Sequence, residues 1–252
     1  DVILVGDETL IAKACNEEGV DVQKFTIVHN PNELQAVAQA VQMIREGQGD
    51  FLMKGLCSTD KFLRAILNKE TGLLPPKGTL THCTTLEIPS YHKLLFVGDV
   101  AVIPAPDIKQ KQIIMECLVK TAKAVGVETP KVALIAATEQ VLASQPATID
   151  AALLAKMAER GQIKGCVADG PLALDVAIDQ ESVSPVAGDA DCLLFPNIES
   201  GNVFYKANSK LVQGVRQAGI LVGAKVPCVL SSRADSIDTK LNSIAIAAMS
   251  VK

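Results

Sequence analysis

A short polar run, Ser231-Ser232-Arg233-Ala234-Asp235-Ser236, stands between an apolar stretch and a helical pattern. It brings hydroxyl, guanidinium and carboxylate groups together within a few positions. A guanidinium binds phosphate through a fork of N–H donors, and a carboxylate can accept a proton during a reaction. A fixed cation or donor can also stabilise an oxyanion that forms in a transition state. The run therefore contains the groups needed to bind an anion and to act on it.

Three other apolar runs are also followed by polar or glycine-rich segments that open a helical pattern. These segments begin at Leu56, Pro171 and Ile198. Ligands of open α/β sheets bind at the carboxyl ends of strands, and helix N-termini suit anions. A single Ser or Thr at such a place more often caps the helix. Four such ends, with basic residues near them, predict a site for an anionic substrate; the basic residues are Lys54, Arg64, Lys206 and Arg233.

Short apolar runs alternate with longer helical patterns along the chain. This alternation predicts an α/β fold with a mostly parallel sheet covered on both faces. Two runs without a helix between them, 80–89 and 92–102, predict an antiparallel insertion. The strands are expected at 2–6, 25–29, 50–55, 131–137, 165–170, 191–197, 219–224 and 228–232, and the helices at 9–19, 31–47, 58–70, 107–126, 173–181 and 236–251.

The segment Pro104-Ala105-Pro106 is the expected crossing point between two α/β lobes that share one sheet system. The first lobe is predicted to hold approximately residues 1–104 and 226–252, and the second approximately residues 105–225. The active-site cleft is expected between them.

The composition excludes several classes of protein. The 252 residues are 48% apolar, with a net charge of −4 and no Trp, which argues against an extended nucleic-acid surface. No apolar run reaches the length of about 18 residues that a membrane span needs. Seven cysteines lie far apart without zinc-ligand spacing, which predicts reduced thiols in a cytoplasmic protein and no metal. The chain opens at Asp1 without Met, so its natural start is expected to be missing.

Common catalytic fingerprints are absent from the sequence. There is no GxGxxG, no GxxxxGK[ST] and no GxSxG. His92, at the head of an apolar run, is predicted to be a hydrogen-bonded structural residue. His29 and His82 lie in expected strands and show no partner in the sequence.

Five segments together resemble the phosphotransacylases, the phosphate acetyl/butyryltransferase family. The resemblance covers essentially the whole chain and is closer to the butyryltransferase branch than to the acetyltransferase branch. The segments are MKGLCSTDKFLRAILNKE (53–70), EIPSYHKLLFVGD (87–99), GCVADGPLALDVAI (165–178), PVAGDADCLLFPNIESGNVFYK (185–206) and SSRADS (231–236).

The resemblance implies a fold similar to the isocitrate/isopropylmalate dehydrogenases, with the active site between two α/β domains, in a homodimer or higher homo-oligomer. It implies the reaction acyl-CoA + phosphate ⇌ acyl phosphate + CoA, without a metal and with coenzyme A as a substrate. Family members usually carry a further strand–helix unit before residues 2–6, and more residues where this chain has only Glu181 to Ser184.

The resemblance also assigns roles to residues of the polar run. Ser232 is expected to hydrogen-bond the thiol sulfur of coenzyme A or the negative charge that develops in the reaction, and Arg233 to bind phosphate and polarise the acyl carbonyl. The family's acidic base falls on Thr239, so the neighbouring Asp238 is the first choice for the base and Asp235 the second. Capping of the last helix is an equal alternative for both carboxylates.

The remaining site residues are expected to bind substrate. Ser58, Thr59 and Arg64 are assigned to phosphate, with Lys54 as a further cation. The side chains of Asn197, Asn202 and Lys206 are expected to line the cleft opposite Ser232, with helix capping or hydrogen bonding between the lobes as the alternative, above all for Asn197. Cys57 lies beside the phosphate site, but a small core residue is the preferred interpretation. We therefore expect direct attack of the CoA thiolate on the acyl phosphate rather than an acyl-cysteine intermediate.

Three alternatives remain open from the sequence. One is a phosphate acetyltransferase, because an added methylene changes discrimination by only about 1–3 kcal/mol. Another is a metal- and nicotinamide-dependent dehydrogenase of the same fold, for which no metal or nucleotide motif is found. The third is a protein that binds acyl-CoA or phosphate without catalysis.

Overall fold

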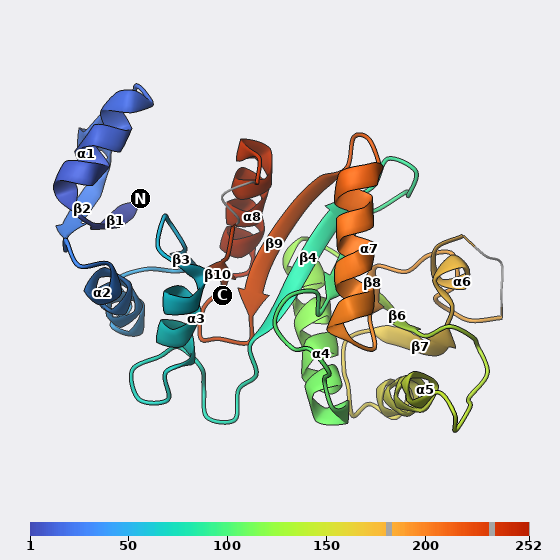
Figure 1. Ribbon diagram of the computed structural model, residues 1–252. Helices are drawn as coiled ribbons and strands as arrows, with labels where there is room; N and C mark the ends of the chain where they lie inside the picture. Colours follow the sequence, from blue (N-terminus) through green and yellow to red (C-terminus); the bar gives the residue numbers. More distant parts are fainter. Residues whose placement is uncertain (180–182, 232–234, 252) are drawn as a thin grey trace.

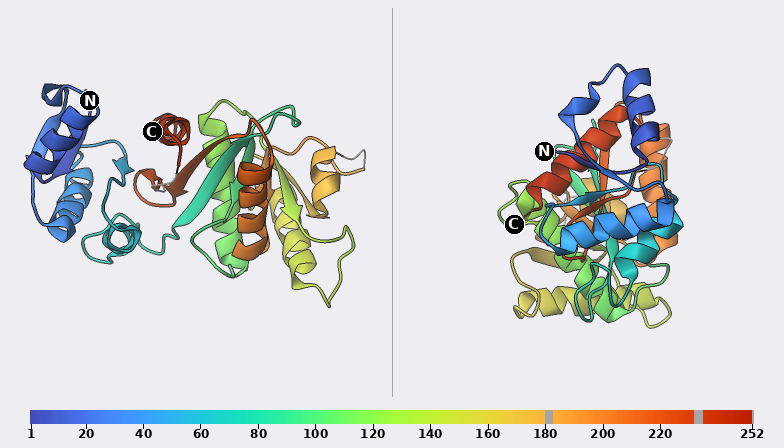
Figure 2. Two further views of the ribbon diagram at one scale, coloured as in Figure 1. Left: turned by 45° about the horizontal axis from the view of Figure 1, so that its top comes forward. Right: turned by 90° about the vertical axis from the view of Figure 1, so that its left-hand side faces the viewer.

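The computed structural model describes residues 1–179, 183–231 and 235–251. The first part of the chain forms a small unit of its own, in which β1 (Ile3–Gly6) and β2 (Thr26–His29) pair in parallel. Helix α1 (Glu8–Glu17), the 3-10 helix η1 (Val22–Lys24) and helix α2 (Glu33–Arg45) complete it. This unit lies at one end of the molecule, and α5 and α6 lie at the other (Figures 1 and 2).

All other strands join one eight-stranded sheet in the order β3-β10-β9-β4-β5-β8-β6-β7. Its strands are β3 (Leu52–Met53), β4 (Thr81–Glu87), β5 (Leu95–Gly98), β6 (Lys131–Ile135), β7 (Val167–Leu172), β8 (Cys192–Leu194), β9 (Arg216–Val222) and β10 (Cys228–Val229). The helices between them are α3 (Thr59–Leu67), α4 (Ile108–Ala124), α5 (Pro146–Glu159), α6 (Leu174–Asp179), α7 (Ile198–Leu211) and α8 (Ile237–Met249).

The predicted α/β class is confirmed, and the sheet is mostly parallel. The parallel pairs are β3–β10, β5–β8, β8–β6 and β6–β7, against three antiparallel pairs, β10–β9, β9–β4 and β4–β5. The antiparallel pair predicted from the runs at 80–89 and 92–102 is present as β4 and β5.

Strand β9 departs from the prediction. The sequence pattern placed it in the parallel series, but it pairs antiparallel with both of its neighbours. The reason is the short connection to β10, residues 223–227. A parallel neighbour needs a crossover of a dozen or more residues, so this connection allows only an antiparallel one. The strands β1 and β2 also stay outside the large sheet.

Both faces of the large sheet are covered, as predicted. Phe96, Val132 and Leu194 pack on one face against buried residues of α4, α5 and α8. Their neighbours in the chain, such as Val97 and Ala133, pack on the other face with residues of α6 and α7. Successive side chains of a strand point to opposite faces, which explains why these runs are continuously apolar. Within the described ranges, no helix is long and apolar enough to cross a membrane.

A nearly buried ion pair joins α4 to α5. The Nζ of Lys111 lies 2.6 Å from Oδ2 of Asp150, and the Lys111 side chain is only 8% exposed. Removing one member of such a pair leaves the other charge buried and unpaired. We expect Asp150→Ala to lower the free energy of unfolding by about 2–3 kcal/mol, measured by urea denaturation. Lys111→Met, which removes the buried charge, should cost clearly less, and an equal or larger loss in Lys111→Met would contradict this account.

The histidine at position 92 has the structural partner that the sequence predicted. Its Nε2 lies 2.9 Å from Oδ1 of Asp189. Asp189 also pairs with Lys93 and Lys131. The hydrogen bond from Lys131 is the largest cause that lowers the pKa of Asp189, followed by those from Lys93 and His92. This charged group fastens the start of β6 to the segment that enters β8.

Candidate active site

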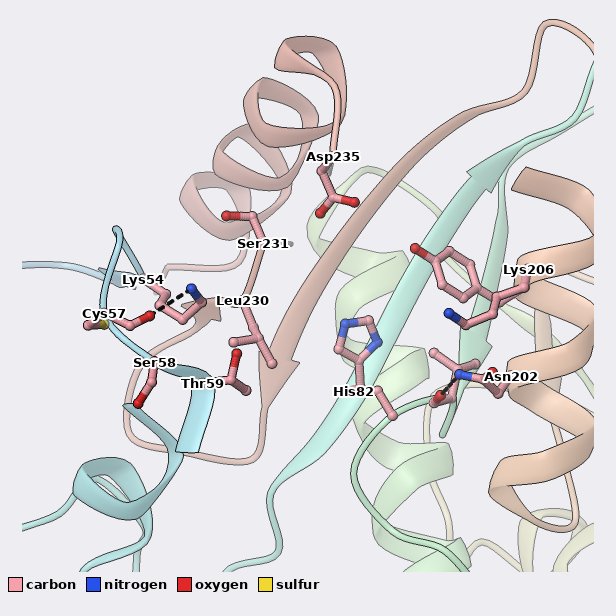
Figure 3. Close-up of a pocket in the computed structure, with 13 residues that line it drawn as sticks. Lys54, Cys57, Ser58, Thr59, His82, Asn202, Lys206, Leu230, Ser231 and Asp235 are labelled. Atoms are coloured by element: carbon pink, nitrogen blue, oxygen red, sulfur yellow. Dashed lines mark hydrogen bonds between the residues drawn. The ribbon is translucent and has the colours of Figure 1, made fainter. Parts of the chain in front are cut away.

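A pocket of about 510 Å³ lies where the carboxyl ends of β3 and β10 meet the end of β5 and one side of α7 (Figure 3). Strands β3 and β10 are parallel, so their carboxyl ends lie side by side, and the loop after β5 reaches the pocket through Val100 and Ala101. The pocket is lined by residues from five parts of the chain: Lys54, Cys57, Ser58, Thr59, His82, Val100, Ala101, Asn202, Tyr205, Lys206, Leu230, Ser231 and Asp235. Strand ends of this kind are where the sequence placed the site.

Lys54 supplies a buried cation to the pocket. It follows β3 directly, is 6% exposed, and its Nζ donates to the backbone oxygens of Gly55 and Cys57 at 3.1 Å each. No carboxylate of the described residues forms an ion pair with it. An ammonium held by neutral carbonyl groups keeps its full charge available for an anion.

The N-terminus of α3 lies beside this lysine. Ser58 caps the helix, since its Oγ accepts from the backbone N–H of Lys61 at 3.3 Å. The hydroxyl hydrogen of Ser58 can still be donated to a ligand, and Thr59 follows at the first helical position. The helix end adds a partial positive charge. Ser58 therefore both caps α3 and lines the pocket.

Helix α7 forms the opposite wall. Asn202 and Lys206 are four residues apart and so lie on the same side of the helix. The Nδ2 of Asn202 donates to the backbone oxygen of Val100 at 2.8 Å, which fixes the loop after β5 as part of the wall. Tyr205 lines the pocket beside them. Burial raises the pKa of its hydroxyl, with the charge of Asp235 as the second cause, so the hydroxyl is a proton donor at neutral pH.

His82, for which the sequence showed no partner, lines the pocket and lies below Asp235 and to the left of Lys206 in Figure 3. His82 is 8% exposed, and its Nδ1 lies 3.1 Å from Oγ1 of Thr84 on the same face of β4. The alternation in β4 could have indicated this, because Cys83 between them is fully buried in the core on the other face.

Three predicted residues do not line the pocket. Arg64 lies about 140° around α3 from Thr59, is exposed, and its Nε pairs with Oδ1 of Asp60 at 3.0 Å. Asn197 caps α7, accepting from the backbone N–H of Ser200 at 3.0 Å. Asp238 is exposed in the first turn of α8, where Ser236 is the capping residue.

The carboxylate that does reach the pocket is Asp235, the second choice of the sequence analysis. Ser232 and Arg233 lie outside the described residues. Their neighbours Ser231 and Asp235 both line the pocket.

Cys57 also lines the pocket, where burial raises the pKa of its thiol. The charge of Lys54 opposes this shift without cancelling it. The thiol is therefore protonated and weakly nucleophilic at neutral pH. All seven cysteines are free thiols. Within the described parts of the chain, no three His, Cys, Asp or Glu side chains are grouped so that they could hold a metal ion.

The pocket can thus bind an anion through Lys54, the start of α3 and Lys206, and it holds two groups that can accept a proton, His82 and Asp235. Cations beside a proton acceptor suit the transfer of a group to or from phosphate.

Comparison with known proteins agrees with this geometry. The family described as "Phosphate acetyl/butaryl transferase" matches residues 5–248. The phosphate butyryltransferase of Clostridium acetobutylicum is 48% identical over 255 residues, which cover 99% of this chain and 84% of that protein.

Solved structures show the same relationship. A branched-chain phosphotransacylase from Enterococcus faecalis superimposes with a TM-score of 0.83 at 27% identity and covers 99% of both chains. A putative 4-hydroxythreonine-4-phosphate dehydrogenase from Salmonella typhimurium shares the fold, with a TM-score of 0.59 at 12% identity over 99% of this chain and 90% of that one. The expected likeness to a dehydrogenase fold is therefore confirmed, and the chain belongs to the phosphate acetyl/butyryltransferase family.

Proposed function

We propose that this protein is a phosphotransacylase that transfers a short acyl group, butyryl or branched, reversibly between coenzyme A and inorganic phosphate. The observation that carries the proposal is the convergence of three motif segments of the family on one pocket. Lys54, Ser58 and Thr59 come from the first segment, Asn202 and Lys206 from another, and Ser231 and Asp235 from the last.

The pocket's groups fit the steps of this reaction. Lys54 and the N-terminus of α3 would hold the phosphate of the acyl phosphate. The CoA thiol loses its proton and attacks the acyl carbonyl, so a carbon–sulfur bond forms and the bond from carbon to the phosphate oxygen breaks. By resemblance to the family, Arg233 would polarise the carbonyl and Ser232 would hydrogen-bond the sulfur.

The attack would be direct. An acyl-enzyme route needs an activated nucleophile, and burial holds the Cys57 thiol in its protonated form. We propose no metal and no resident cofactor, with coenzyme A and phosphate as substrates.

The preferred length of the acyl chain is the more specific part of the proposal. The preference for four- or five-carbon chains rests on the butyryltransferase-like motifs and on the 48% identity to a phosphate butyryltransferase. Acetyl transfer is the alternative, since the matching family includes both activities in its description. Discrimination by one methylene is worth about 1–3 kcal/mol, or roughly 10- to 200-fold.

A thiol-release assay with acetyl-, butyryl- and branched acyl-CoA tests the chain preference. Each acyl-CoA is incubated with full-length protein, with and without phosphate, and free thiol is measured. We expect phosphate-dependent release that is fastest with four- or five-carbon chains and is lost in Ser232→Ala and Arg233→Ala. Fastest release from acetyl-CoA would favour the acetyltransferase alternative, and binding of acyl-CoA without release would favour a non-catalytic binding protein.

The cytoplasmic location and the homo-oligomer stay predictions from the sequence. Sedimentation of the purified full-length protein would give its mass in solution, and a monomer at micromolar concentration would contradict the predicted oligomer.

A further inference from the structure

The reaction needs a group that takes the proton of the CoA thiol, and the first choice of the sequence, Asp238, is exposed outside the pocket. A free thiol has a pKa of about 8.5 and is mostly protonated at neutral pH. The acceptor must lie in the pocket, be unprotonated, and have a basicity close to that of the thiol. The pocket's titratable side chains can be compared on these terms.

Most of them do not qualify. Lys54 and Lys206 are cations and have no lone pair to accept a proton. The hydroxyl of Tyr205 and the thiol of Cys57 are held protonated, in both cases mainly by burial. Two acceptors remain, the carboxylate of Asp235 and the imidazole of His82. A carboxylate is a far weaker base toward a thiol than an imidazole is.

The imidazole of His82 is also held in a fixed position. Its Nδ1 shares a hydrogen bond with the Thr84 hydroxyl, and its backbone N–H donates to Oδ2 of Asp99 at 3.2 Å. Gly219 on β9 leaves room for the ring, since a Cβ at that position would lie 3.0 Å from both Cε1 and Nε2. No described residue hydrogen-bonds Nε2, so this nitrogen is left for a ligand.

We propose that His82 accepts the proton of the CoA thiol through Nε2 and returns it to the sulfur in the reverse direction. This inference rests on the proposed phosphotransacylase function. In the direction from acyl phosphate, the S–H bond breaks and an N–H bond forms at Nε2. The sulfur then bonds to the acyl carbon, and phosphate leaves with the electrons of the carbon–oxygen bond. The imidazolium releases its proton to water through the open pocket before the next turnover.

Charges around the ring set the pH at which it can act. Burial lowers the pKa of His82 below its ordinary value of 6.5, and the charges of Asp99 and, less strongly, Asp235 oppose this shift. The ring is therefore neutral at pH 7 and can accept a proton. Activity should fall as pH drops through this lowered pKa. Among the described residues, the charged and titratable groups of the pocket around the ring are those of Asp99, Asp235, Tyr205, Lys206, Lys54 and Cys57.

The test is the pH profile of kcat for acyl-CoA formation from butyryl phosphate and coenzyme A. Wild-type protein should show an acid limb below pH 6.5. His82→Gln should lower kcat by about 100-fold or more and lose this limb. Asp235→Asn should keep the limb but move it to lower pH, because a negative charge that favours the imidazolium is gone. His29→Gln, which changes an exposed histidine on β2, is the matched control and should behave as wild type.

Several outcomes would overturn the proposal. One is a His82→Gln enzyme with an unchanged limb and at least a third of wild-type kcat. Another is loss of the limb in Asp235→Asn alone, which would make the carboxylate the acceptor. If thermal unfolding shows that His82→Gln does not fold, the test is the pH profile of Asp235→Asn. An acid limb at the same pH as in the wild-type protein would then refute the role of His82. Inactive wild-type protein would instead refute the proposed function, so the two failures are distinguishable.

Discussion

Replacing Lys54 by Met is expected to raise the KM for phosphate by about 10- to 100-fold, while the KM for acyl-CoA changes much less. Lys54 is the buried cation of the pocket, and its Nζ is held only by two backbone carbonyls among the described residues. A hydrogen bond to a charged partner is worth about 1.5–3 kcal/mol, which converts to this range of affinity. Steady-state kinetics with phosphate varied at saturating acyl-CoA would measure the effect.

Lys13→Met is the matched control, because Lys13 is an exposed lysine of α1 that pairs with Glu17. It should leave both KM values unchanged. If Lys54→Met destabilises the fold but keeps the wild-type KM for phosphate, Lys54 only ties down the loop of Gly55 and Cys57. The assignment of phosphate to this end of the pocket would then be wrong.

Replacing Asp99 by Ala is expected to lower the free energy of unfolding by about 3–5 kcal/mol. Asp99 is 2% exposed and accepts four hydrogen bonds. Its Oδ2 accepts from the Thr81 hydroxyl at 2.7 Å and from the His82 backbone, and its Oδ1 accepts from the backbone N–H groups of Ala101 and Val102 at 2.7 and 2.9 Å. Alanine leaves all four donors without their acceptor.

The same change should impair catalysis, because these bonds hold His82 and the wall at Val100 and Ala101 in place. Urea denaturation gives the stability, and kcat at low temperature gives the activity of the folded fraction. Asp50→Ala, on the exposed loop before β3, should change stability by no more than about 0.5 kcal/mol. A loss below about 1 kcal/mol in Asp99→Ala would show that the carboxylate does not organise this side of the pocket.

The covering of the sheet by helices on both faces could be predicted from local sequence patterns, whereas the pairing of neighbouring strands could not. Runs such as 131–137 and 191–197 are apolar at every position because both faces of their strands are buried, and that signal is present in the sequence. The antiparallel place of β9 depends on which strand lies beside it in space. Only the brevity of residues 223–227 indicates it.

The site residues, too, divide into those that local sequence patterns predict and those whose place depends on the three-dimensional fold. Ser58 and Lys54 could be predicted because they stand at a strand–helix boundary, where the side chains face the sheet edge. Arg64 depends on helix phase, which points it away from Thr59 and toward Asp60. Asp238 and Asp235 differ by less than a helical turn, and only the path of the chain into α8 decides which reaches the pocket. His82 lies in a strand, as expected, but its place in the pocket could not be predicted because its partners Asp99 and Gly219 are distant in sequence.

Product identity tests the central claim most directly. Butyryl-CoA and phosphate are incubated with the full-length protein, and phosphorus NMR follows the phosphate signal while free thiol is measured in the same sample. The account predicts one acyl phosphate for each thiol released, and reversal of the reaction when coenzyme A is added in excess. Thiol release that yields free butyrate instead of acyl phosphate, or release that is independent of phosphate, would contradict it.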